Sequence, residues 1–165
     1  VGTPRPILEW GLETMTRLAP PPAPRVLCHN DFRTGNLMVA EGRLSGVLDW
    51  EFARWGDPHE DLGWFCAPCW RFGNRALEAG GLGPRDAFLE GYAAEAGWTP
   101  DPGRVAYWEL GASIRWAIIA ADQAQRFLSG AESSLELALT AHIIPELELD
   151  ILEQCDVLER QAAHA

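Results

Sequence analysis

Apolar residues recur at helical spacing over most of the chain. The first such pattern predicts an amphipathic helix over residues 6–18, with apolar positions at Ile7, Leu8, Leu12, Met15 and Leu18. Beyond residue 61 the pattern is almost entirely helical. We expect four further helices, near residues 58–70, 84–96, 102–128 and 133–161.

Two of these helices carry local signals. Asp57 can cap the helix near residue 58, with Pro58 in its first position and Glu60 completing a capping-box-like pair. Pro145 lies within the last helical pattern, and it should kink or split that helix because proline lacks a backbone N–H.

Short apolar runs between the first two helices predict strands instead. Residues 26–28 form one short buried strand, and residues 37–40 and 44–48 form two more, joined by a turn at 41–43. This hairpin would hold the loop that ends at Asn36 close to the loop that starts at Asp49. The fold is therefore expected to be mainly α with one small β-hairpin.

Length and composition favour one globular domain. The 165 residues are 47% apolar, which argues against disorder and suits a single domain over residues 1–165. Within it, residues 1–25 form a lead-in helix and a Pro-rich connector. The first residues lack the apolar core of a signal peptide, and no apolar run reaches the ~18 residues of a membrane span, so we expect a cytoplasmic protein.

The net charge of −11 argues against a nucleic-acid partner, because phosphate backbones bind basic surfaces. It mildly favours a cationic or metal-bridged ligand, although acidity also serves solubility. Eight tryptophans could include walls of a substrate pocket, but core packing is the favoured interpretation. The candidates are Trp50, Trp55, Trp64, Trp70 and Trp116.

Cys66 and Cys69 have the C-x-x-C spacing of zinc and redox sites. A zinc site needs about four ligands. Only Cys28 and His29 could supply the others, and no second C-x-x-C occurs. Two small buried residues in a Trp-rich segment is the favoured interpretation.

The polar stretch at residues 29–36, HNDFRTGN, stands between two apolar runs. The hairpin would place Asn36 beside Asp49, and their amide and carboxylate oxygens suit Mg²⁺ next to phosphate groups. Asp31 would project from the same loop, where it could accept a proton from an attacking hydroxyl. Phosphoryl transfer needs this division of labour.

The combined motif resembles a known family. H-x-D-x-x-x-x-N at 29–36 is followed by a hairpin, by LDWE at 48–51 and by GDPHEDL at 56–62. Together they resemble the aminoglycoside phosphotransferase and choline kinase-like family, and the resemblance covers nearly the whole chain. In its sequence motifs, the chain most resembles bacterial phosphotransferases related to the kinase-like domains fused to acyl-CoA dehydrogenases. The implied fold is the C-terminal, large lobe of a protein-kinase-like enzyme.

The resemblance also implies roles for single residues. Asp31 is similar to the catalytic base, and Asn36 and Asp49 to the ligands of the metal that holds the nucleotide. Arg33 falls where protein kinases carry a lysine that faces the transferred phosphoryl group, although it could equally be a surface residue.

The loop itself has two supporting residues and one departure from the family. His29 and Asp61 are similar to residues that steady the catalytic loop. Asn30 replaces the usual glycine of H-G-D, and asparagine tolerates positive φ better than most residues.

The implied activity is transfer of the γ-phosphoryl group of ATP, or of GTP, to a hydroxyl of a small molecule with Mg²⁺. The residues before the first strand hold neither the glycine-rich loop nor the lysine of an N-terminal lobe, and the sequence has no lysine anywhere. We therefore expect that lobe to be absent and the isolated chain to be inactive. The alternative is a non-catalytic binding domain of kinase-like ancestry. The exposed cleft face could pair two copies in a homodimer.

Overall fold

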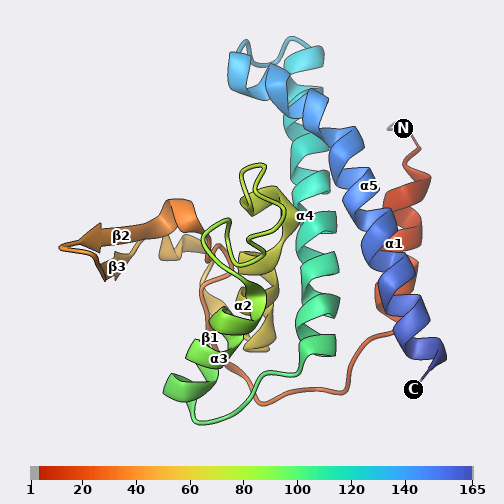
Figure 1. The fold of residues 1–165 in the computed structure, drawn as a ribbon. Coiled ribbons are helices and arrows are strands. Elements are labelled where there is room, and N and C mark those ends of the chain that lie inside the picture. The colour runs from red at the N-terminus through yellow and green to blue at the C-terminus, as the bar shows by residue number, and fades with distance from the viewer. Residues whose placement is uncertain (1–3, 165) are drawn as a thin grey trace. The chain divides into compact units, whose positions relative to one another are not determined.

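The structure, a computed structural model, describes residues 4–164 and is mostly helical with small antiparallel strand pairs (Figure 1). This confirms the fold class expected from the sequence. The chain divides into two compact units, Pro20–Glu109 and Val1–Ala19 with Leu110–Ala165. The single-domain boundary at 1–165 stays a prediction.

The unit formed by the two ends of the chain is a helical bundle. It contains α1 (Pro6–Arg17), the second part of α4 (Pro102–Leu128) and α5 (Leu135–Ala163), and α1 lies along α5 (Figure 1). Helix α5 continues through Pro145 and does not split there. The buried side chains that follow the proline, Leu147 and Ile151 among them, hold the helix together across the missing hydrogen bond.

The central unit, Pro20–Glu109, contains four strands in two pairs. Strand β2 (Leu37–Ala40) pairs with β3 (Arg43–Val47) in the expected hairpin, which projects from the rest of this unit (Figure 1). In the second pair, β1 (Val26–Cys28) was predicted, but its partner β4 (Arg54–Gly56) was not, because β4 has no alternating pattern of its own. This pair fixes the start of the polar loop, which follows Cys28 directly.

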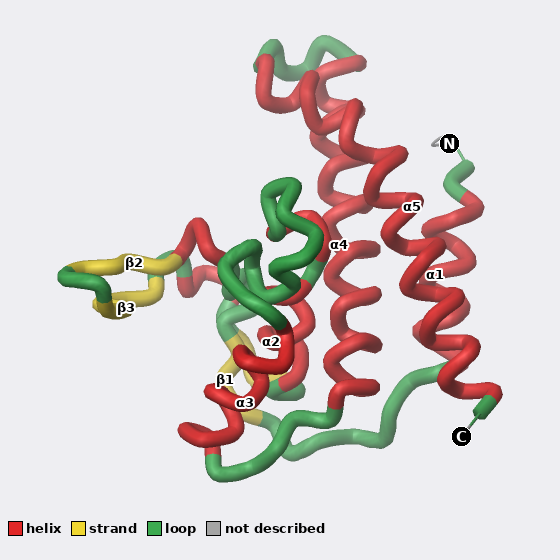
Figure 2. The backbone as a smooth tube through the Cα atoms, viewed as in Figure 1, coloured by secondary structure: helices red, strands yellow, loops and turns green. Residues whose placement is uncertain are grey.

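Helices of the central unit enclose a small apolar core. Helix α2 (His59–Cys66), α3 (Arg85–Ala96) and the first turns of α4 contribute one residue each: Leu62, Leu89 and Val105. A single helix over 58–70 was expected, but α2 ends at Cys66 and a 3₁₀ turn, η3 (Pro68–Trp70), follows. Pro68 explains the break, because a residue before proline avoids helical geometry. An irregular stretch then leads to α3 (Figure 2).

The start of α2 is held by the expected capping pair. Asp57 accepts from the backbone N–H of His59 at 3.0 Å, and Glu60 accepts from the backbone N–H of Asp57 at 3.0 Å. Asp57 also accepts from Arg104 at 2.7 Å and from the indole of Trp108 at 3.1 Å. Burial alone would raise the pKa of Asp57, but these hydrogen bonds lower it overall. Capping therefore also ties α2 to α4.

Helices α2 and α4 touch at Gly63. A Cβ atom there would stand 2.6 Å from the backbone nitrogen of Glu109 and from the carbonyl carbon of Trp108. We predict that Gly63→Ala lowers the free energy of unfolding by about 1–3 kcal/mol in urea titrations, because backbone cannot yield as a side chain does. The matched control is Gly91→Ala on α3, where a Cβ meets nothing within 4 Å; it should stabilise by about 0.5–1 kcal/mol. Equal effects would contradict the close approach.

Candidate active site

Asp61 anchors the polar loop through two backbone hydrogen bonds. Its Oδ2 accepts from the N–H of His29 and its Oδ1 from the N–H of Asn30, both at 2.7 Å. Asn30 has φ 63°, the left-handed conformation expected where the family has glycine. One carboxylate of α2 therefore holds the turn that leads out of β1.

The ring of His29 links this loop to the end of the hairpin. Its Nδ1 accepts from the backbone N–H of Asp31 at 3.1 Å, so Nδ1 carries no proton and Nε2 donates to the carbonyl of Leu48 at 2.6 Å. The ring also packs on Trp50, with 4.6 Å between centroids. These contacts join the loop to the end of the hairpin, and the supporting role of His29 stays a prediction.

Asn36 lies at the end of the 3₁₀ turn η1 (Thr34–Asn36), 2% exposed. Its Nδ2 donates to the backbone carbonyl of Asp31 at 2.8 Å and to Asp31 Oδ2 at 2.7 Å. Both partners are acceptors, which identifies the nitrogen end of the amide. Oδ1 accepts no hydrogen bond from the residues that the structure describes, so it is free to contact a bound group.

The hairpin brings Asn36 to the start of the next loop, as expected. The backbone N–H of Leu48 donates to the carbonyl of Asn36 at 2.8 Å, one residue before Asp49. Asp49 is exposed and has φ 61° and ψ 57°, a strained conformation for an aspartate. Its carboxylate makes no hydrogen bond or ion pair within residues 4–164. The two uncommitted groups, an amide and a carboxylate oxygen, fit a hard cation such as Mg²⁺.

The carboxylate of Asp31 receives three side-chain donors. Oδ2 accepts from Asn36 and, at 3.3 Å, from Nε of Arg33, while Oδ1 accepts from Nε1 of Trp64 at 3.1 Å. The guanidinium of Arg33 also lies 5.1 Å from the ring centroid of Trp70. Arg33 is thus beside Asp31 rather than free in solvent.

Five of the six predicted site residues are joined by direct contacts: Asp61 and His29 hold the loop, and Arg33 and Asn36 contact Asp31. Asp49 is linked to them only through the backbone of its neighbour Leu48. Two contributors were missed. Leu48 acts through backbone atoms, which no side-chain pattern reveals. Trp64 had been considered as a pocket wall or a core residue, and the only available signal was its position three residues after Asp61.

The cysteine pair gives no support to a zinc site. Cys66 is fully buried, and burial raises the pKa of its thiol to about 12, far from the thiolate that a metal needs. The described part of the chain holds no group of three or more His, Cys, Asp or Glu side chains placed to bind a metal ion. Cys66 packs as a small buried residue, whereas Cys69 is only half-buried.

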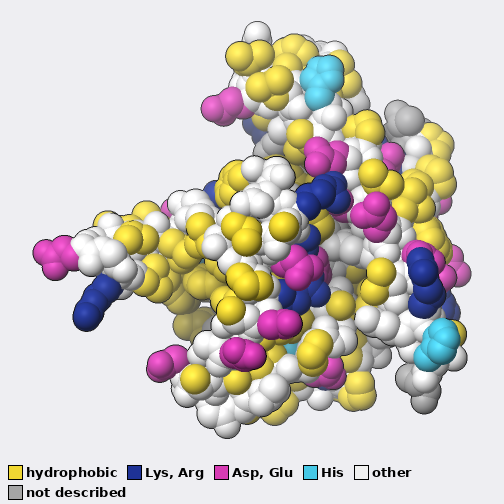
Figure 3. All heavy atoms as spheres, in the orientation of Figure 1, with side chains coloured by type: hydrophobic (Ala, Val, Ile, Leu, Met, Phe, Trp, Pro, Cys, Tyr) yellow, Lys and Arg dark blue, Asp and Glu magenta, His cyan; other side chains and the backbone are white. Residues whose placement is uncertain are grey.

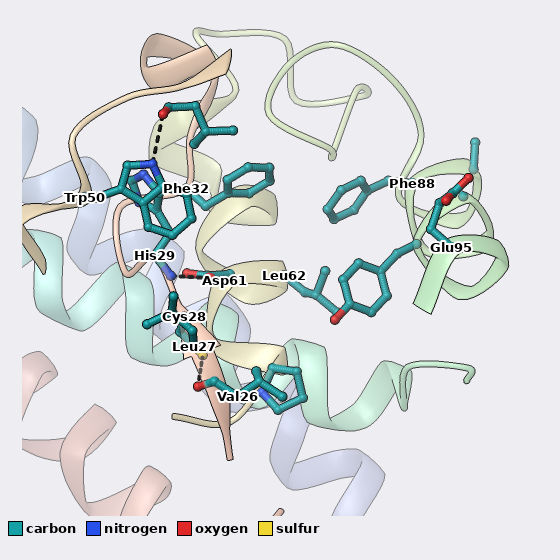
Figure 4. Close-up of a pocket in the computed structure, with 15 residues that line it drawn as sticks. Val26, Leu27, Cys28, His29, Phe32, Trp50, Asp61, Leu62, Phe88 and Glu95 are labelled. Atoms are coloured by element: carbon teal, nitrogen blue, oxygen red, sulfur yellow. Dashed lines mark hydrogen bonds between the residues drawn. The ribbon is translucent and has the colours of Figure 1, made fainter. Parts of the chain in front are cut away.

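An open, largely apolar cavity of about 640 Å³ is lined by residues of β1, α2 and α3. Phe32 and Phe88 face each other across it, and His29, Trp50 and Asp61 line one side (Figure 4). Trp50 is the only one of the five candidate tryptophans in its wall. Asp31, Asn36 and Asp49 are not among its lining residues, although Phe32 and His29 of the same loop are.

None of the described helices is long and apolar enough to cross a bilayer. The cytoplasmic location stays a prediction.

The domain is mainly helical, and its polar loop and hairpin are joined by the backbone hydrogen bond from Leu48 to Asn36. The model of the phosphotransferase enzyme family matches residues 3–108. The chain belongs to that family. A search of curated proteins found no match, and the narrower likeness to acyl-CoA dehydrogenase-fused domains stays a prediction.

Solved structures show the same fold. A protein of Ralstonia eutropha JMP134 assigned as an aminoglycoside phosphotransferase superposes with a TM-score of 0.71 at 20% identity, over 93% of this chain and 50% of its own. A thermostable mutant of aminoglycoside phosphotransferase APH(4)-Ia, in ternary complex with AMP-PNP and hygromycin B, gives 0.56 at 20% identity, over 97% and 45%. The chain therefore spans about half the length of these structures.

We predict that Asp61→Asn lowers the free energy of unfolding by about 1–3 kcal/mol, because the amide nitrogen would face one of the two loop N–H groups and leave that donor unsatisfied. Urea titration measures the loss, and faster amide exchange at His29 or Asn30 locates it. Asp86→Asn, an exposed change in the first turn of α3, is the matched control and should cost less than about 0.5 kcal/mol. Equal losses would contradict the anchoring role.

Proposed function

We propose that this chain is the catalytic lobe of an ATP-dependent O-phosphotransferase that acts on a small-molecule hydroxyl. The observation that carries the proposal is the double hydrogen bond from Asn36 Nδ2 to Asp31, which orients the carboxylate and leaves Asn36 Oδ1 free for a cation. In a turn that serves only to connect two strands, a polar side chain would normally face water, whereas the Asn36 amide is buried against Asp31.

Asp31 is the general base of the proposed reaction. The hydroxyl loses its proton to Asp31, its oxygen bonds to the γ-phosphorus of ATP, and ADP leaves with the electrons of the broken P–O bond. Arg33, held beside Asp31, offers positive charge for the transferring group. The protein's contribution is positioning and charge, which is typical of phosphoryl transfer.

Asn36 Oδ1 and the Asp49 carboxylate would hold Mg²⁺, which when bound neutralises phosphate charge and fixes the phosphates. Support for a nucleotide comes from the similar APH(4)-Ia structure, whose complex contains AMP-PNP and hygromycin B. We propose the same two classes of ligand here, a nucleoside triphosphate and a hydroxyl-bearing small molecule; GTP remains an alternative to ATP.

The isolated 165 residues should turn over ATP weakly or not at all. Similar structures are about twice as long, which supports an additional lobe that contributes to nucleotide binding in the proposed enzyme. The alternative is a non-catalytic binding domain of the same ancestry. It would be favoured if the protein binds a hydroxyl compound but consumes no nucleotide.

The test is ADP release by the full-length protein with Mg-ATP and a panel of alcohols that starts with hygromycin B. We predict that Asp31→Ala lowers kcat at least a hundredfold, and that Asp49→Asn raises the Mg²⁺ concentration needed for half-maximal rate. Asp86→Asn is the control for a lost surface charge. Full activity in Asp31→Ala would overturn the assignment.

We also propose that the apolar surface of the central unit pairs two copies of the chain. Hydrophobic side chains lie along the hairpin and around its base (Figure 3). The cross-strand pair Leu27 and Trp55 is 56% and 64% exposed, more than a surface without a partner usually leaves open.

Light scattering over a range of protein concentrations tests this pairing. We predict a dimer that Trp55→Glu weakens at least tenfold, while Leu128→Glu, a change at a 70% exposed leucine of α4, has no effect. A strict monomer at all concentrations would refute the pairing.

A further inference from the structure

Among the described residues, Trp64 is the one hydrogen-bond donor to the Asp31 carboxylate that lies outside residues 29–36. Its indole N–H donates to Asp31 Oδ1 at 3.1 Å, and its side chain is 5% exposed. The other two donors, Asn36 and Arg33, both bond Oδ2. The two oxygens of this carboxylate therefore have different surroundings.

Helix α2 brings two functions to the loop in a single turn. Asp61 and Trp64 are three residues apart, so their side chains project from the same face of the helix. Asp61 holds the loop backbone at His29 and Asn30, while Trp64 reaches the side chain that follows. The rotation of the Asp31 carboxylate is thus set relative to the same helix that fixes its backbone.

Packing holds the indole in place. The rings of Trp64 and Trp70 lie 5.5 Å apart between centroids. The guanidinium of Arg33 packs on the ring of Trp70. Arg33 returns to Asp31, which closes a ring of four side chains. Gly35 lies next to this arrangement, since a Cβ there would meet the terminal guanidinium of Arg33, which would have to shift.

We propose that Trp64 is a positioning residue that makes Oδ1 of Asp31 the oxygen that receives the substrate proton; this inference rests on the proposed phosphotransfer. A carboxylate oxygen has two lone pairs. Asn36 and Arg33 occupy both on Oδ2, whereas Trp64 occupies one on Oδ1 and leaves the other directed to a hydroxyl. Phenylalanine at this position would fill the space but could not donate.

The test compares two indole donors in the full-length protein. Trp64→Phe removes the donor and keeps an aromatic ring. The matched control is Trp108→Phe, because Trp108 also donates to a carboxylate at 3.1 Å, that of Asp57, away from the site. Rates are measured as ADP release from Mg-ATP with hygromycin B, or with water where hygromycin B is not an acceptor.

We expect Trp64→Phe to lower kcat about tenfold to a hundredfold with KM for Mg-ATP unchanged, as for a lost hydrogen bond to a charged group. Trp108→Phe should reduce stability to a similar degree and leave kcat within twofold. A kcat within twofold in a folded Trp64→Phe protein would overturn the proposal, as would equal kcat losses in both variants.

An NMR measurement on the 165-residue chain separates this inference from the proposed function. The indole N–H of Trp64 should exchange slowly and shift in Asp31→Asn, while that of the 64% exposed Trp55 exchanges fast and does not shift. Fast exchange at Trp64 would refute the contact whether or not the protein has activity. Because this measurement needs no Trp64 variant, it tests the contact even if Trp64→Phe fails to fold. A protein with the Trp64 signal but no ADP release would overturn the phosphotransfer and the catalytic part of this inference, leaving only the contact.

Discussion

The site depends on one carboxylate that accepts two neighbouring backbone N–H groups. Asp61 holds His29 and Asn30 at 2.7 Å each, and both of these loop residues are buried. Two converging donors away from water need two acceptor atoms at fixed spacing, which a carboxylate supplies and other short side chains do not. With the loop backbone fixed, the left-handed turn at Asn30 follows, and the chain leaves β1 in the direction that brings Asp31 to Asn36 and Trp64.

From that anchor the arrangement spreads by direct bonds. The ring of His29 reaches the carbonyl of Leu48, and the N–H of Leu48 reaches the carbonyl of Asn36, whose side chain returns to Asp31. The ends of the loop and of the hairpin are therefore parts of one hydrogen-bonded circuit. Such a circuit suits chemistry in which the protein supplies geometry and charge and forms no covalent intermediate.

The sequence predicted the elements with strong local signals and missed what depends on distant partners. The hairpin and the capping pair at Asp57 and Glu60 follow from local residue chemistry, and both are present. The positive φ at Asn30, where the similar family has glycine, is present as well. Strand β4 was missed because it exists only through pairing with β1. The indole of Trp64 was not assigned to Asp31, since a sequence shows that an aromatic residue is buried but not where its N–H points. The metal is predicted from residue type and the nucleotide from the resemblance to the family, and both remain predictions.

The strained backbone at Asp49 lowers the stability of the fold at a position that the proposed site needs. Aspartate is more strained than glycine at φ 61°, so Asp49→Gly should relieve strain while it removes the proposed ligand oxygen. Random mutagenesis selected only for heat resistance would thus tend to erase this residue. Its retention under such selection would require a second pressure, and laboratory evolution of the chain could reveal that pressure without knowledge of the substrate.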